Sequence, residues 1–91
     1  MEPPWHVILL DDDFHTFEYV VEMLHAIFGH SRDLGKRMAD EVNDTGRVIV
    51  ATVHKELAEL RQQQIEEFGP DPHEDAPQGQ VSMKALIECS E

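Results

Sequence analysis

Hydrophobic and polar positions near the N-terminus predict a buried strand followed by an amphipathic helix. Residues 6–10 are almost continuously apolar, which is typical of a strand that is covered on both faces or lies at the centre of its sheet. Three consecutive carboxylates, Asp11 to Asp13, end this strand at a surface. From Phe17 to about Gly29 the apolar residues recur with the helical period, so we expect a helix that packs one face on the sheet and ends at a left-handed glycine.

The middle of the chain predicts a second helix and a second strand. Ser31 suits the N-cap of this helix, with Asp33 in its first turn. Residues 43–46, Asn-Asp-Thr-Gly, have the composition of a turn, and the β-branched run from 47 to 53 is typical of a strand. The helix is expected to be only partly buried, because its apolar residues form one narrow stripe: Leu34, Met38 and Val42.

The last third of the chain predicts a third helix, a loop and a third strand. The helix runs from Lys55 to about Phe68 and is ended by a Gly-Pro pair. Residues 69–80 combine prolines, glycines and acids, so we expect a mobile acidic loop there. Residues 81–88 then predict the third strand. The order β-α-α-β-α-β indicates a small α+β domain, with a three-stranded antiparallel sheet and three helices packed on one side.

Length and charge narrow the classes of function. The chain has 91 residues and is expected to be one domain, with a short extended lead-in (1–5), a core (6–88) and a tail (89–91). Its net charge of −12 disfavours nucleic acid and anionic membranes as partners and favours cationic ones. A single cysteine, Cys89, excludes an internal disulfide, and we find no transmembrane run or signal peptide. A cytoplasmic monomer without a cofactor is therefore expected.

The acidic corner after the first strand leaves several interpretations open. Adjacent carboxylates repel one another unless water, backbone N–H groups or a cation compensates them. A solvated acidic turn is one interpretation, and a metal site formed by Asp11 to Asp13 with His15 is another. Catalysis is the least favoured, because no Ser/His/Asp or Cys/His arrangement is evident.

Several short motifs occur together in an order that resembles the bacterial ClpS family of Clp protease adaptors. The pattern V-I-L-x-[ND]-D-D-[YF]-x-x-x-[EF]-[FY]-V is matched by residues 7–20. The helix-turn-strand around Gly46, the E-x-A-E of residues 56–59 and a closing strand that ends in glutamate also match. The resemblance extends from Trp5 to Glu88, and it rests on the joint order and spacing of the motifs.

This resemblance implies a binding protein and not an enzyme. Family members bind the free α-amino group and the bulky hydrophobic first side chain of proteins that carry an N-degron, and they deliver these proteins to the protease through the ClpA unfoldase. Matched position by position, the resemblance assigns amine binding to Asp11, Asp12, Asp13 and Asn43. Asp11 stands where the family has an asparagine and Asn43 where it has a histidine, and both keep an acceptor oxygen for an ammonium group.

The same matching assigns the walls of a side-chain pocket. Phe17 and Ala39 stand where the family usually has methionines. We expect Ala39 to deepen the pocket and Phe17 to narrow or re-aim its mouth, which would change the preferred first residue. His15 replaces a threonine-like residue ahead of the helix, so Thr16 or Asp13 is expected to serve as the N-cap. The wall positions are His15, Phe17, Val20, Ala39 and Val42.

Other functions remain open at this stage. Docking to the unfoldase is assigned by the resemblance to charged positions of the third helix, Glu56 and Arg61. The acidic corner could instead admit a basic first residue, such as arginine or lysine. A pure interaction domain, which binds the unfoldase without reading any N-terminus, is the remaining alternative. Without the resemblance, Phe17, Val20 and Val42 would be interpreted as ordinary core residues.

Overall fold

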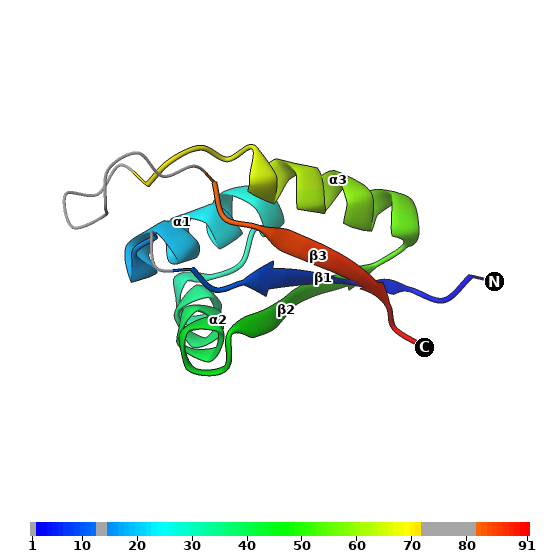
Figure 1. Cartoon of the computed structure of the whole chain (residues 1–91), viewed down its shortest axis with the longest axis horizontal. Coiled ribbons are helices and arrows are strands. Elements are labelled where there is room, and N and C mark those ends of the chain that lie inside the picture. Colours follow the sequence, from blue (N-terminus) through cyan, green and yellow to red (C-terminus); the bar gives the residue numbers. More distant parts are fainter. Residues whose placement is uncertain (1, 13–14, 72–81) are drawn as a thin grey trace.

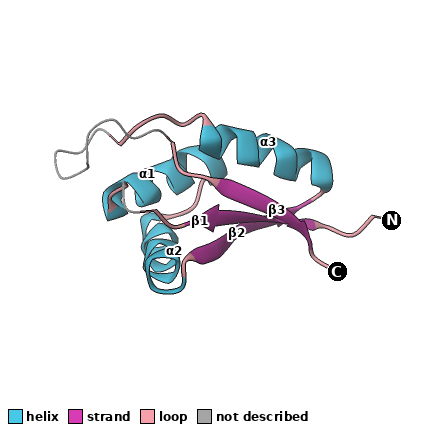
Figure 2. Cartoon of the chain, in the orientation of Figure 1, coloured by secondary structure: helices cyan, strands magenta, loops and turns pink. Residues whose placement is uncertain are grey.

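The computed structural model describes residues 2–12, 15–71 and 82–91 and contains three strands and three helices in these ranges. Figure 1 shows their arrangement, and Figure 2 separates the helices from the sheet by colour. The predicted α+β class and the predicted order of elements are confirmed. The elements are β1 (Trp5–Leu10), α1 (Phe17–Phe28), α2 (Arg32–Thr45), β2 (Arg47–Val53), α3 (Lys55–Glu66) and β3 (Ala85–Cys89).

The first strand, β1, is the centre of the sheet. The strand order is β2-β1-β3, and β1 is antiparallel to both of its neighbours. Leu9 of β1 lies opposite Val48 on one side and Ala85 on the other. Because β1 has a paired strand along each edge, side chains on both of its faces are shielded by their neighbours, and Val7 to Leu9 are fully buried. This burial explains why its apolar run is continuous.

Helices cover one face of this sheet and leave the other face open. Ile8 lies opposite Ile49 and Leu86, so these three residues share the open face. Ile49 and Leu86 are 45% and 42% exposed, whereas Ile8 between them is fully buried. An ion pair of 3.0 Å joins Arg47 to Glu88, which lie on the two outer strands.

Capping residues set the ends of the first two helices. Thr16 is the N-cap of α1, since its side chain accepts a hydrogen bond from the backbone N–H of Tyr19. Gly29 ends α1 with a φ of 73°, a left-handed conformation that glycine adopts without steric cost. Ser31 caps α2 in the same way as Thr16 caps α1, through the N–H of Leu34.

Three predicted boundaries differ from those in the structure. Residues 43–45 are not part of a turn, because α2 continues to Thr45 and ends at Gly46, whose φ is 88°. The third strand does not begin at residue 81, which lies outside the described residues. It begins at Ala85 and extends to Cys89, which pairs with Trp5. Ser82 and Met83 precede it as buried residues without strand structure. The third helix also ends at Glu66, slightly earlier than expected.

Candidate functional site

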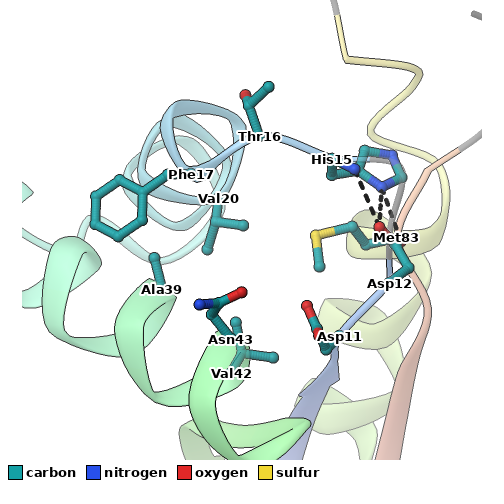
Figure 3. Close-up of a pocket in the computed structure, with 10 residues that line it drawn as sticks. All are labelled: Asp11, Asp12, His15, Thr16, Phe17, Val20, Ala39, Val42, Asn43 and Met83. Atoms are coloured by element: carbon teal, nitrogen blue, oxygen red, sulfur yellow. Dashed lines mark hydrogen bonds and ion pairs between the residues drawn. The ribbon is translucent and has the colours of Figure 1, made fainter. Parts of the chain in front are cut away.

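A pocket of about 190 Å³ lies where four parts of the chain meet. These parts are the segment that follows β1, the start of α1, the second half of α2 and the segment before β3 (Figure 3). All of the predicted site residues that belong to the described part of the chain contribute to it, apart from the two on α3. Its lining consists of Asp11, Asp12, His15, Thr16, Phe17, Val20, Ala39, Val42, Asn43 and Met83.

The polar end of the pocket is formed by the residues that follow β1 and those that end α2. The backbone N–H of Asp11 donates to the carbonyl oxygen of Gly46 at 3.0 Å, which holds these two chain segments together. Asn43 lies in the last turn of α2, and Figure 3 shows its side-chain amide facing the carboxylate of Asp11. Since the predicted turn is helical, Asn43 is presented from a rigid element. Two acceptor groups from different elements therefore meet at one place.

Asp12 is held by His15. The Nδ1 atom of His15 lies 2.8 and 2.9 Å from the two carboxylate oxygens of Asp12, and the backbone N–H of His15 donates to the same group at 3.1 Å. The imidazole is only 2% exposed. A carboxylate accepts hydrogen bonds, so these distances fit an Nδ1 atom that carries its proton. His15 thus lines the pocket as the partner of a carboxylate, and this role was not anticipated from the sequence.

The apolar end of the pocket is formed by α1, α2 and the segment before β3. Val20, Ala39, Val42 and Met83 are all nearly inaccessible to solvent in the absence of a ligand. Phe17 is different, because 41% of its surface is exposed at the start of α1. The sequence did not assign Met83 or Thr16 to the pocket, although Thr16 was expected as a candidate N-cap. The alternation of apolar residues before β3 was the available signal for Met83, since it places that side chain on the same face as Ala85.

Phe17 and Ala39, the two wall residues that stand where methionine was expected from the resemblance, lie on the same side of the pocket. Figure 3 draws the ring of Phe17 and the methyl group of Ala39 there, away from Asp11. One turn before Ala39, Gly35 packs directly on α1, and a Cβ atom at that position would lie 3.4 Å from Val21. Small residues on α2 therefore let α1 approach closely. The large Phe17 side chain belongs to α1 and lines the pocket from that helix.

The remaining predicted residues lie elsewhere. Asp13 is outside the described residues. Glu56 is exposed in the first turn of α3, whereas Arg61 is half-buried and donates to Gln64 at 2.8 Å. The Arg61 guanidinium also lies 5.9 Å from the ring centre of Phe28, so it is directed towards α1. Neither residue contributes to the pocket.

Metal and membrane sites were also sought in the described parts of the chain. Over residues 2–12, 15–71 and 82–91, no three or more His, Cys, Asp or Glu side chains are grouped so that they could hold a metal ion. Over the same ranges, we find no helix with the length and apolar character needed to cross a bilayer.

A compact α+β domain whose described residues form a pocket that is acidic at one end and apolar at the other defines a small binding module. Comparison with known proteins identifies which one. The family model of the ATP-dependent Clp protease adaptor protein ClpS matches residues 1–74. The ClpS adapter protein of Nostoc sp. is 40% identical over 68 residues, which cover 74% of this chain and 70% of the relative. The chain belongs to the ClpS family of Clp protease adaptors, as its motifs predicted.

The fold has a counterpart among solved structures. Agrobacterium tumefaciens ClpS2 bound to L-phenylalaninamide superimposes with a TM-score of 0.83, covering 98% of this chain and 99% of that chain at 22% sequence identity. At this identity the likeness concerns the fold. The described helices and strands are arranged as they are in that protein.

Proposed function

We propose that this adaptor binds the N-terminal residue of substrate proteins in the pocket and delivers them to the Clp protease. The observation that carries the proposal is the division of the pocket: acceptor oxygens of Asp11 and Asn43 at one end and buried apolar side chains at the other. An unblocked N-terminal residue has a matching charged part and apolar part, because its amine and its side chain are attached to the same carbon atom. In this role the protein acts in the cytoplasm as a monomer, by binding and not by catalysis.

The amine would bind between β1 and α2. Asp11 supplies a negative charge and Asn43 a carbonyl oxygen, and an ammonium group can donate three hydrogen bonds. Asp12 contributes a second carboxylate that His15 holds in place. Asp13 is part of the proposal through the family pattern alone. A hydrogen bond to a charged group is worth about 1.5 to 3 kcal/mol, so acetylation of the amine should remove most of the affinity.

The first side chain would pack on the apolar walls. Val20, Ala39, Val42 and Met83 are already shielded from water, so a ligand side chain that reaches them transfers its own surface from water to an apolar site. Support comes from the ligand of Agrobacterium tumefaciens ClpS2, since L-phenylalaninamide carries a free α-amine and a phenyl side chain. Among the described residues, no Lys or Arg side chain lines the pocket.

The test is fluorescence anisotropy with short labelled peptides that differ only in their first residue. Each peptide is measured with a free and with an acetylated N-terminus. We expect saturable binding of free peptides that begin with Phe, Tyr, Trp or Leu, and at least a tenfold loss on acetylation. Equal affinity for both forms would refute recognition of the amine. Stronger binding of Arg-first or Lys-first peptides would show that the acidic end reads the side chain instead.

A matched pair of substitutions separates direct contact with the amine from attraction by the overall negative charge. Asp11→Ala removes the proposed amine ligand and is expected to weaken binding about tenfold to a hundredfold. Asp44→Ala removes an equal charge from the end of α2, and Asp44 does not line the pocket. The control should retain nearly full affinity. Equal losses in the two variants would indicate that only the overall negative charge attracts the peptide.

We further propose that α3 docks on the unfoldase, with Glu56 as the principal charged contact. Glu56 is exposed, whereas Arg61 is engaged with Gln64 and Phe28. Calorimetry with the N-terminal domain of a ClpA-type unfoldase tests this assignment. Glu56→Ala should weaken binding more than Arg61→Ala, and Glu59→Ala provides an exposed control on the same helix. Equal affinities for Glu56→Ala and the Glu59→Ala control would overturn the assignment.

A further inference from the structure

The segment from Gly69 to Asp71, which follows α3, lies against the start of α1. The carboxylate of Asp71 accepts a hydrogen bond from the backbone N–H of Thr16 at 2.6 Å, although the two residues are far apart in sequence. Asp71 is only 8% exposed, which is unusual for a carboxylate. It lies at the N-terminus of α1, where backbone N–H groups and the helix dipole favour a negative charge.

Tyr19 connects the same segment to α1 a second time. Its hydroxyl group donates to the carbonyl oxygen of Gly69 at 2.5 Å, and its ring meets the ring of Phe68 edge to face with centres 5.6 Å apart. On its other side, Tyr19 lies 4.5 Å from the ring centre of His15, the residue that holds Asp12. Tyr19 thus joins the Gly69–Asp71 segment to the polar end of the pocket.

A third hydrogen bond carries the connection to the opposite wall. The backbone N–H of Gly69 donates to the side-chain oxygen of Ser82 at 2.5 Å. Ser82 is buried and immediately precedes Met83, whose side chain lines the pocket. Thr16 and Met83 belong to different walls, and the Gly69–Asp71 segment is hydrogen-bonded to Thr16 and to Ser82, the residue before Met83. We refer to these three hydrogen bonds, from Thr16, Tyr19 and Gly69, as the clamp.

We propose that Asp71 is a positioning residue for ligand selectivity, because the clamp fixes the spacing between the α1 wall and the Met83 wall. This inference rests on the proposed function of the pocket. A first side chain packs well only if the two walls stand at a fixed distance, and one extra or missing methylene changes the affinity by about 10- to 200-fold in such pockets. Loss of the Asp71 carboxylate frees the start of α1 to move relative to Met83, so the pocket should become less selective for size.

The test measures selectivity as well as affinity. Peptides that begin with Phe, Leu and Val are titrated against the wild type, Asp71→Ala and Asp71→Asn. Glu59→Gln serves as a control, because it removes a charge from an exposed position on α3. We expect the ratio of dissociation constants between the first residues to fall about fivefold or more in Asp71→Ala, while the effect of N-terminal acetylation is retained. Asp71→Asn keeps an acceptor oxygen for the Thr16 N–H and should restore much of the ratio.

A second variant removes a different hydrogen bond of the clamp. Ser82→Ala removes the acceptor of the Gly69 N–H and should lower the ratio in the same direction, even if Asp71→Ala folds poorly. Unchanged ratios in folded Asp71→Ala or Ser82→Ala would overturn the proposal and leave Asp71 a purely structural residue. Absence of peptide binding by the wild type is a different result. It would overturn the proposed function, and the role of the clamp in selectivity with it.

Discussion

Replacement of Tyr19 by phenylalanine is expected to destabilise the fold by an amount that depends on pH. The hydroxyl group is buried and donates to Gly69 at 2.5 Å, and the side chain is 1% exposed. The variant leaves the carbonyl oxygen of Gly69 without this donor. An unsatisfied buried acceptor costs about 1 to 3 kcal/mol. For a domain of this size each kcal/mol lowers Tm by about 4 to 8 °C.

The same burial gives the prediction its pH dependence. Burial raises the pKa of the Tyr19 hydroxyl above its ordinary value of 10.0, and the negative charges of Asp71 and Asp12 raise it further. The folded chain therefore holds this proton more tightly than the unfolded chain. The resulting stabilisation is complete below pH 10.0 and is lost as the pH rises from there through the pKa of the folded state. Tyr19→Phe lacks this dependence.

The chain has one tryptophan and one tyrosine, and each serves as a spectroscopic probe in the assay. Trp5 is the only tryptophan, so its fluorescence reports urea unfolding of the wild type and Tyr19→Phe at neutral and alkaline pH. Tyr19 is the only tyrosine, so ultraviolet absorbance of the phenolate reports its ionisation without assignment. We expect the difference in unfolding free energy between the two proteins to shrink above pH 10.0. A native-state titration midpoint at the ordinary value, or equal unfolding free energies at neutral pH, would contradict the reasoning.

Further predictions concern the pocket, a cap and a surface ion pair. Ala39→Met adds bulk at a nearly inaccessible wall position and should weaken binding of Phe-first peptides by about 1 to 3 kcal/mol, measured by anisotropy. Gly29→Ala meets no atom within 4 Å but must adopt a φ of 73°, so a loss of about 1 to 2 kcal/mol in urea unfolding is expected from the backbone alone. Replacement of both Arg47 and Glu88 by alanine should change stability by less than about 1 kcal/mol, because the pair is half exposed, and salt should diminish the difference.

Local sequence signals predicted the fold because they act over a few residues. The continuous apolar run of β1 indicated a central strand, and β1 is central. Gly29 and Ser31 were expected as caps, and both serve as caps. These features depend on backbone conformation and on hydrogen bonds to residues a few positions away, so they can be identified without knowledge of the tertiary structure.

The errors have two causes, one local and one that involves tertiary contacts. Asn43 has the composition of a turn residue, but the helix continues through it because Gly46 provides a better left-handed end. Met83 looked like an ordinary strand residue, whereas the chain forms a strand only from Ala85. The contacts of Asp71 with Thr16 and of Tyr19 with Gly69 each join residues about half the chain apart. No periodicity or motif in the sequence indicates such contacts.

We propose that the acidic corner receives an ammonium group of a ligand, and not water alone. A run of carboxylates that served only to solvate a turn would be expected to point its side chains into solvent. Instead, the carboxylate of Asp12 is partly buried, with 21% of its side chain exposed, and is held by the buried imidazole of His15. Asp11 is exposed, but it faces Asn43 at the acidic end of a pocket whose described lining contains no Lys or Arg side chain. A ligand that carries a positive charge beside a hydrophobic group would complement both the carboxylates and the apolar walls of this pocket.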